Sequence, residues 1–241
     1  MRFAILADIH GNLEAFREVL KDAEKQRVER YVCLGDIVGY NANPKECLDI
    51  VREMKMFCVK GNHDEYCSGE GELEGFNPQA ARAIEWTRER LSKEDREWLR
   101  KLRYKRLVTS FAIVHATLDV PERWGYVFDK LAAAASFTYQ NTRVCFFGHT
   151  HVPVAFVRDG GVVRGGNYSK FHVEPHKKYF VNVGSVGQPR DGNPHAAYVV
   201  YDAREGSIEL RRLPYDIPAT QKKILDAGLP PRLAERLAAG R

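Results

Sequence analysis

Short apolar runs alternate with helical patterns through the first sixty residues of the chain. Residues 3–7, 31–34 and 56–59 have the composition of buried strands. Between them, apolar side chains recur at helical spacing over residues 13–23 and 44–51, which predicts two amphipathic helices. This strand–helix–strand–helix–strand order predicts an α/β fold, in which a mostly parallel sheet carries helices on its faces.

The pattern changes in the second half of the chain, where strands become more frequent. Residues 77–102 are expected to form two helices, and residues 128–140 a further helix. Further strands are expected near residues 104–108, 111–115, 143–147, 152–157, 179–183, 196–202 and 207–213, and a Gly160-Gly161 turn after residues 152–157 predicts a hairpin there. We expect residues 1–241 to form a single domain, with residues 214–241 as a helical C-terminal extension.

The composition is that of a globular protein and excludes several classes. Hydrophobic residues make up 44% of 241 residues, so the chain can bury a sizeable core. No apolar stretch approaches the ~20 residues of a membrane span, so no membrane association is predicted. The net charge of +5 comes without a dense Lys/Arg block, so nucleic-acid binding is not indicated.

The cysteines and the N-terminus predict the cellular compartment. The chain has five cysteines and no Cys-x-x-Cys pair, and Cys33, Cys58 and Cys145 fall inside apolar runs. We therefore expect reduced cysteines in the core. The apolar run at the N-terminus is too short for a signal peptide. Together these features predict a protein of the reducing cytoplasm.

Five of the predicted strands end in polar segments that contain possible metal ligands. Five of the eight histidines lie in these segments. The segments are Asp8-Ile9-His10, Gly35-Asp36, Gly61-Asn62-His63-Asp64, His115, and Gly148-His149-Thr150-His151. Any one of them is also consistent with a simple capped turn. Five in one chain favour a functional site, because open α/β sheets bind ligands at the carboxyl ends of their strands.

The donor types favour a centre of two divalent metals. Carboxylates and imidazoles without thiolates suit Mn, Fe, Ni or Zn. The candidates are more numerous than one tetrahedral shell requires, and two ions about 3.5–4 Å apart would use them all. The carboxylate of Asp36 is the natural bridge, since an imidazole cannot easily join two ions. The seven candidate ligands are Asp8, His10, Asp36, Asn62, His115, His149 and His151.

The order of these blocks resembles the signature of the calcineurin-like metallophosphoesterase superfamily. The resemblance is strongest to its small bacterial and archaeal members, which also have a run similar to residues 182–192. It implies a two-sheet β-sandwich flanked by helices, with four layers in the order α/β/β/α. It further implies that His63 faces the substrate as an acid or charge stabiliser and that Asp64 orients its imidazole. The implied ligand sets are Asp8, His10, Asp36 and His151 for one metal, and Asp36, Asn62, His115 and His149 for the other.

The resemblance implies a phosphoesterase with a small phosphoester substrate. We expect hydrolysis of phosphodiester bonds by a hydroxide bound to two metal ions, Mn²⁺ foremost, with Fe, Ni or Zn as other possible metals. Phosphoprotein phosphatases and dinucleoside tetraphosphatases of the superfamily have Asp-Arg-Gly where this chain has Gly39-Tyr40-Asn41. Their phosphate-gripping arginine is therefore missing, which favours diesters. Arg190 is the candidate replacement, since guanidinium pairs with phosphate oxygens; the alternative is a solvent-exposed turn residue.

Two other functions are consistent with these residues. The first is a phosphomonoesterase that acts on nucleotides or phosphoproteins. The second is a metal-binding scaffold that keeps the fold without the catalysis. All seven ligand candidates and His63 are present in this chain, which favours an enzyme.

Overall fold

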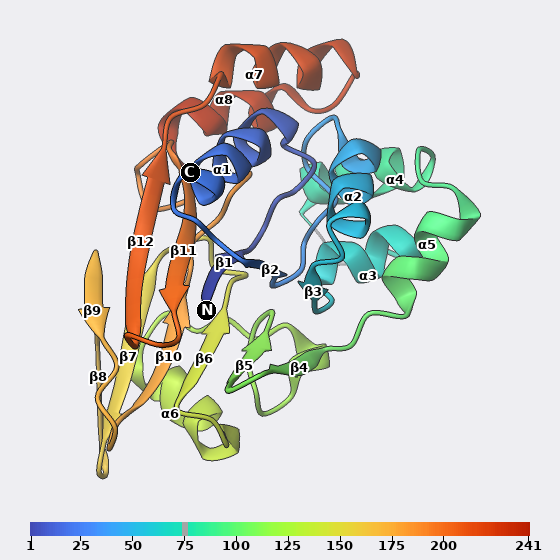
Figure 1. Cartoon of the computed structure of the whole chain (residues 1–241). Helices are drawn as coiled ribbons and strands as arrows, with labels where there is room; N and C mark the ends of the chain where they lie inside the picture. Colours follow the sequence, from blue (N-terminus) through green and yellow to red (C-terminus); the bar gives the residue numbers. More distant parts are fainter. Residues whose placement is uncertain (74–76) are drawn as a thin grey trace.

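The computed structural model describes residues 1–73 and 77–241, and its centre is two six-stranded sheets packed face to face (Figure 1). The first sheet has the spatial order β3 (Phe57–Cys58), β2 (Arg30–Cys33), β1 (Arg2–Leu6), β11 (Ala196–Asp202), β12 (Ser207–Leu213) and β9 (Lys170–His172). The second has the order β4 (Lys105–Val108), β5 (Phe111–Val114), β6 (Val144–Phe147), β10 (Lys178–Asn182), β7 (Val154–Asp159) and β8 (Val162–Gly166).

The first sheet is mixed, which corrects the expectation of a mostly parallel sheet. β1 pairs in parallel with β2, and β2 with β3, as the strand–helix alternation predicts. The pairings of β1 with β11, β11 with β12, and β12 with β9 are antiparallel. The difference arises because distant strands of the β-rich second half add to the edge of the first three strands. Local periodicity does not carry that information.

Side chains alternate between the two faces of β1, and this alternation explains the layers of the sandwich. Phe3 and Ile5 point into a core shared with the second sheet, whereas Ala4 and Leu6 point into a core shared with the helices of the other face. A third core joins the second sheet to α6, through Phe137 among others. The predicted α/β/β/α sandwich is therefore confirmed.

The helices cover the outer faces and one end of the sandwich (Figure 1). Most lie where the sequence predicts them, but the short α3, which follows β3, and β9 were not predicted. In the parts of the chain that the structure describes, no helix has the length and apolar character needed to cross a bilayer. The α-helices are α1 (Leu13–Lys25), α2 (Pro44–Glu53), α3 (Asn62–Ser68), α4 (Pro78–Arg88), α5 (Lys93–Arg100), α6 (Lys130–Tyr139), α7 (Ile217–Asp226) and α8 (Pro231–Ala239).

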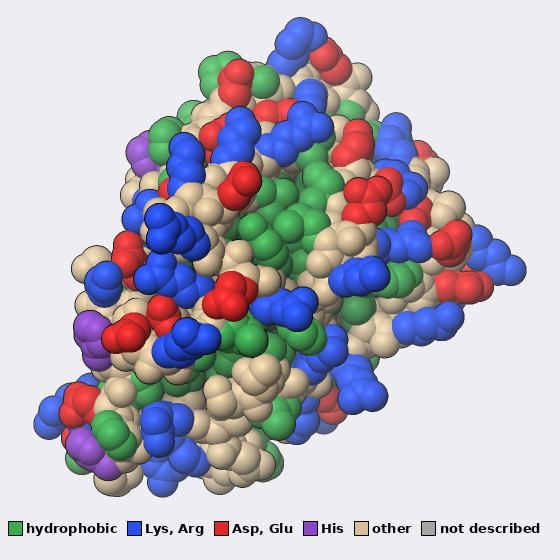
Figure 2. All heavy atoms as spheres, in the orientation of Figure 1, with side chains coloured by type: hydrophobic (Ala, Val, Ile, Leu, Met, Phe, Trp, Pro, Cys, Tyr) green, Lys and Arg blue, Asp and Glu red, His purple; other side chains and the backbone are tan. Residues whose placement is uncertain are grey.

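The cysteines lie in the core, as the sequence predicts. All five cysteines are free and buried. On the face that Figure 2 shows, Lys and Arg side chains are interspersed with Asp and Glu around a central hydrophobic patch.

Candidate metal centre

The polar segments that follow β1, β2, β3, β5 and β6 meet at one end of the sandwich. Backbone hydrogen bonds join the first two of them: the Asp8 N–H donates to the Gly35 carbonyl and the His10 N–H to the Asp36 carbonyl, at 3.1 and 2.9 Å. The structure thus brings together six of the seven predicted ligands in two groups that could hold metal ions, and all six are buried. The seventh, Asn62, lies beside the second group.

The backbone at this site is strained. Ten non-glycine residues of the described chain have positive φ, and five of these are candidate ligands. Such conformations cost roughly 1–3 kcal/mol each and cluster at functional sites. The positive φ values let alternate residues of a turn, such as Asp8 and His10, aim their side chains inward. The five are Asp8, His10, Asp36, His149 and His151, with φ between 50° and 66°.

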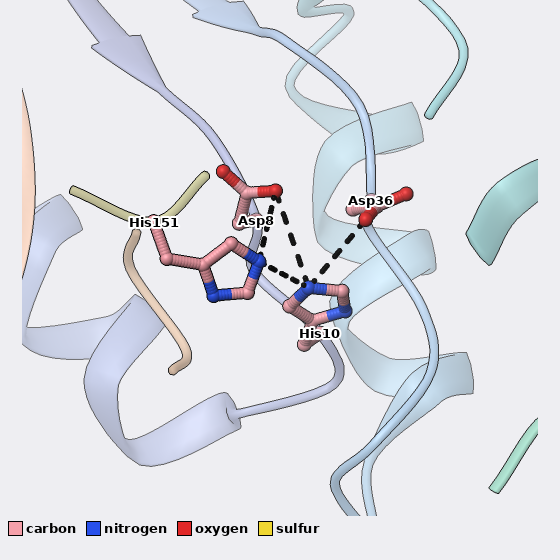
Figure 3. A group of neighbouring side chains, drawn as sticks. All are labelled: Asp8, His10, Asp36 and His151. Carbon is pink, nitrogen blue, oxygen red and sulfur yellow. Dashed lines mark hydrogen bonds and ion pairs between the residues drawn. The ribbon is translucent and has the colours of Figure 1, made fainter. Parts of the chain in front are cut away.

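The first donor group combines Asp8, His10, Asp36 and His151 (Figure 3). Their donor atoms lie within 4.8 Å of one another. Nε2 of His10 is 3.2 Å from Nε2 of His151 and 3.5 Å from Oδ2 of Asp36. Nε2 of His151 is 3.4 Å from Oδ1 of Asp8. Two carboxylates and two imidazoles therefore converge on one point, which suits a divalent ion.

The second donor group contains Asp36, His115 and His149. Nε2 of His115 is 3.5 Å from Oδ2 of Asp36 and 3.2 Å from Nδ1 of His149. Oδ1 of Asn62 lies 3.1 Å from the same nitrogen of His115. The oxygen Oδ2 of Asp36 therefore faces both groups, which is the position that a bridging ligand would take.

The imidazole tautomers are fixed by the backbone. In each of the four imidazoles one ring nitrogen donates to a main-chain carbonyl, because a carbonyl can only accept. The four bonds run from His10 Nδ1 to Val38, from His115 Nδ1 to Leu34, from His149 Nε2 to Trp124 and from His151 Nδ1 to Gln188, at 3.1, 2.8, 2.9 and 2.5 Å.

In each of two histidine pairs, the fixed tautomers leave two unprotonated ring nitrogens facing each other. Burial lowers the pKa values of these imidazoles, so they are neutral near pH 7. The free nitrogens of His10 and His151 are then both acceptors, and so are those of His115 and His149. Two acceptors 3.2 Å apart cannot hydrogen-bond to each other, but both can bind a cation. Imidazoles held in this way by backbone carbonyls are typical of metal ligands.

The structure gives Asp64 a role other than the predicted one. Its carboxylate accepts backbone N–H groups from Asp36, Ile37 and Gly61 at 2.8, 2.9 and 3.0 Å, and a longer one from Val38. Among the described residues, no hydrogen bond joins this carboxylate to the His63 ring. The described structure therefore shows no direct hydrogen bond through which Asp64 would orient the His63 ring. Asp64 instead fixes the loop that carries Asp36.

His63 lies beside the donor groups but differs from their imidazoles. Its Nδ1 is buried and has no hydrogen-bond partner among the described residues. Its ring packs 4.3 Å from the Tyr40 ring and 4.8 Å from the His10 ring, between centroids. Gly39, with φ +93°, makes room for it, since a Cβ there would lie 2.5 Å from Nδ1. An uncommitted ring at this place is free to interact with a substrate.

Arg190, the candidate phosphate contact, lies at the edge of the site. Its N–H donates to the His151 carbonyl at 3.2 Å, and its guanidinium donates to the Gln188 side chain at 2.8 Å. The guanidinium carbon lies 5.6 Å from the Tyr40 ring centroid. Arg190 is half-buried, so the alternative of a fully exposed turn residue does not hold.

Two contacts to His149 were not predicted as part of the site. The Tyr126 ring stacks on the His149 ring at 4.3 Å, and the Trp124 carbonyl accepts its Nε2 proton. Trp124 has φ 55°, which turns its backbone toward the ring. No local motif marks either residue, because the loop that carries them reaches the site only through the tertiary fold.

The buried titratable groups determine how the stability of chelator-treated protein depends on pH. Burial lowers the pKa values of the five histidines of the site from 6.5. These rings are protonated only in the unfolded chain as the pH falls through 6.5, which destabilises the folded state. Burial also raises the pKa values of Asp8 and Asp64 to about 6 and that of Asp36 well above 3.8. These three carboxyls have the opposite effect, since over this range they keep a proton only in the folded state.

The five histidines outnumber the three carboxyls. We therefore expect the free energy of unfolding to decrease as the pH falls from about 7 to about 5. Each net proton taken up on unfolding changes the free energy of unfolding by about 1.4 kcal/mol per pH unit. Urea unfolding in EDTA at several pH values measures this slope. A urea midpoint that increases as the pH falls would contradict the assignment of neutral, buried imidazoles.

Comparisons with known proteins agree with the fold and the site. Residues 1–206 match the model of the calcineurin-like phosphoesterase superfamily domain. The chain is 37% identical to an uncharacterized protein of Methanocaldococcus jannaschii, over 99% of this chain and 98% of that protein. It superimposes on the crystal structure of a metallophosphoesterase from Sphaerobacter thermophilus with a TM-score of 0.89 and 37% identity, covering 100% and 99% of the two chains. A hypothetical protein of Pyrococcus horikoshii has the same fold, with a TM-score of 0.82 and 18% identity, covering 100% and 98%.

The sandwich and its carboxylate–imidazole cluster define a hydrolase with a metal site. The chain belongs to the calcineurin-like phosphoesterase superfamily, as the five motif blocks predict. Members of this family use divalent metals, and the two donor groups fit such ions in residue type and protonation state.

Proposed function

We propose that the protein hydrolyses small phosphodiesters with two divalent metal ions, Mn²⁺ foremost. The observation that supports this most strongly is the pair of donor groups that share Oδ2 of Asp36. When bound, two divalent ions would offset the phosphate charge and lower the pKa of water toward about 7. One ion would be held by Asp8, His10, Asp36 and His151, and the other by Asp36, Asn62, His115 and His149.

The side chains around the donor groups would handle the substrate. His63 can donate a hydrogen bond to the leaving oxygen, because its ring has no bond within the described protein that holds its proton. Arg190 presents a guanidinium that Gln188 already orients, which suits non-bridging phosphate oxygens. Both therefore act on charge that develops at the phosphate and at the leaving group.

The preference for diesters is supported by charge and by space. A diester carries one negative charge where a monoester dianion carries two. At the position of the family's missing arginine, the neutral ring of Tyr40 packs against His10 and His63, which leaves Arg190 as the guanidinium beside the donor groups. A cleft of about 520 Å³ opens next to these residues and offers room for a second ester substituent.

Paired chromogenic substrates test this proposal. We expect protein loaded with Mn²⁺ to cleave bis(4-nitrophenyl) phosphate with a higher kcat/KM than 4-nitrophenyl phosphate. The reverse order would favour the phosphomonoesterase. Bound metal without hydrolysis of either ester would favour the scaffold. Loading separate samples with Mn²⁺, Ni²⁺, Zn²⁺ or Mg²⁺ identifies the metal that supports turnover. We also propose a cytoplasmic location, where five buried free cysteines stay reduced.

A further inference from the structure

The cleft beside the donor groups is continuous with the candidate metal centre. It is lined by residues of the loops around the site, by the start of α4 and by α8. Three of its lining residues each contact a candidate ligand, so a substrate bound at the metal centre would extend into this cleft. These pairs are Tyr40 with His10, Tyr126 with His149, and Arg190 with His151.

The cleft is strongly basic. Four guanidinium groups line it, against the single carboxylate of Glu235 among the described lining residues. None of the four forms an ion pair with a carboxylate in the described ranges 1–73 and 77–241, although such pairs are frequent elsewhere on this protein. The four are Arg190, Arg232, Arg236 and Arg241.

Helix α8 presents two of these arginines on one face. Arg232 and Arg236 are one turn apart and both line the cleft. Like charges at this spacing destabilise a helix, so helix stability alone does not explain the pair. The adjacent face anchors α8, because Leu233 and Leu237 are buried in a cluster with Trp86 of α4. The helix that carries the two guanidiniums is therefore held in place by packing.

Arg236 carries a charge that its surroundings do not compensate. It is half-buried, and its Nε donates to a main-chain oxygen of Arg241, while its terminal nitrogens have no hydrogen bond to any residue that the structure describes. Burial, and then the charge of Arg190, lower its pKa to about 10. An anion between these two guanidiniums would relieve both effects.

We propose that this cleft binds a second phosphate of the substrate, with Arg232 and Arg236 of α8 as its main contacts. The substrates would then be phosphodiesters that bear a further terminal phosphate, such as a 5′-phosphorylated dinucleotide. The aromatic walls, Tyr40 and Tyr126, provide stacking surfaces for a base or other planar group. This inference rests on the proposed function, since it assigns the substrate class of the same site.

The test compares two dinucleotides that differ only in the terminal phosphate, pdTpdT and dTpdT. Calorimetric titration of each dinucleotide into protein treated with a chelator gives Kd. Hydrolysis by protein loaded with Mn²⁺ gives KM and kcat. We expect wild-type protein to bind pdTpdT about tenfold more tightly, since one charge-assisted contact is sufficient for this factor. Arg236→Gln and Arg232→Gln should each reduce the preference, and the double variant should abolish it.

The control is Arg204→Gln, which removes the same charge from the exposed turn between β11 and β12. This variant should keep the preference. Turnover of bis(4-nitrophenyl) phosphate, which has no second phosphate, should stay within about twofold of wild type in this control variant. Equal affinity for the two dinucleotides, or a preference that survives in the double variant, would overturn the proposed phosphate site.

The two proposals fail in different ways. Hydrolysis of both dinucleotides without a preference would reject the second-phosphate site alone. A calorimetric preference for pdTpdT that the double variant abolishes would support that site even if no diester were hydrolysed, and would then count against the proposed activity.

Discussion

Replacing Asp36 by asparagine is expected to remove both metal ions and the phosphoesterase activity together. Oδ2 of Asp36 lies 3.5 Å from the free nitrogens of His10 and His115, which belong to different donor groups. The asparagine amide has one oxygen, and the backbone N–H of His63 already donates to the corresponding Oδ1 at 2.8 Å. The NH₂ group would then face both ion positions, where a donor repels a cation.

Metal analysis and chelator-controlled unfolding measure this effect. Wild-type protein should hold about two Mn²⁺ ions per chain, and Asp36→Asn close to none. Mn²⁺ at a thousand times its Kd should stabilise the wild type by about 4 kcal/mol for each ion bound and leave the variant unchanged. In EDTA the variant should be at least as stable as the wild type, because it removes a carboxyl whose pKa burial raises.

Asp8→Asn is the matched comparison, since Asp8 belongs to the first donor group alone. It should cost about one ion per chain where Asp36→Asn costs about two. Two ions retained in Asp36→Asn would reject the bridging role. Loss of one ion in both variants would place Asp36 in a single group.

The sequence predicts the donors of this site better than their arrangement. Asp8, Asp36 and His115 could be found because each follows an apolar run, and the carboxyl ends of strands meet at one edge. Their donor angles could not be predicted. The positive φ values of Asp8 and Asp36, and the carbonyl that fixes each imidazole, depend on contacts between distant loops.

The fold, like the site, could be predicted from the sequence only in part. The apolar run at residues 3–7 places β1 correctly, and its alternating faces explain the two cores on either side of the first sheet. The antiparallel strand β11 comes from almost 200 residues further along the chain, and its pairing with β1 has no local signal, although the strand itself was predicted. Likewise, Asp64 follows His63 directly in the motif, yet its carboxylate binds backbone N–H groups of the Asp36 loop. Adjacency in sequence did not indicate contact between side chains.

Replacing His63 by alanine is expected to lower turnover on the order of 10²–10⁴-fold while the metal content stays near that of wild type. Unlike the four ligand imidazoles, the His63 ring makes no hydrogen bond that commits one of its nitrogens within the described chain. Burial, and then the charge of Arg190, keep its pKa well below 6.5, which favours a neutral ring in the free protein. Such a ring can still donate its proton's hydrogen bond to a leaving oxygen as negative charge develops there.

Metal analysis and kinetics on the same preparations separate this role from metal binding. Loss of either ion in His63→Ala would make His63 a ligand and contradict the assignment. His63→Gln keeps a hydrogen-bond donor and most of the buried volume, so it should retain more activity than the alanine variant. Gly39→Ala supplies an independent probe, because its Cβ would lie 2.5 Å from Nδ1 of His63 and must displace the ring. We expect it to reduce kcat with both metals still bound, since the position of the His63 ring, and not its presence alone, determines whether it reaches the leaving oxygen.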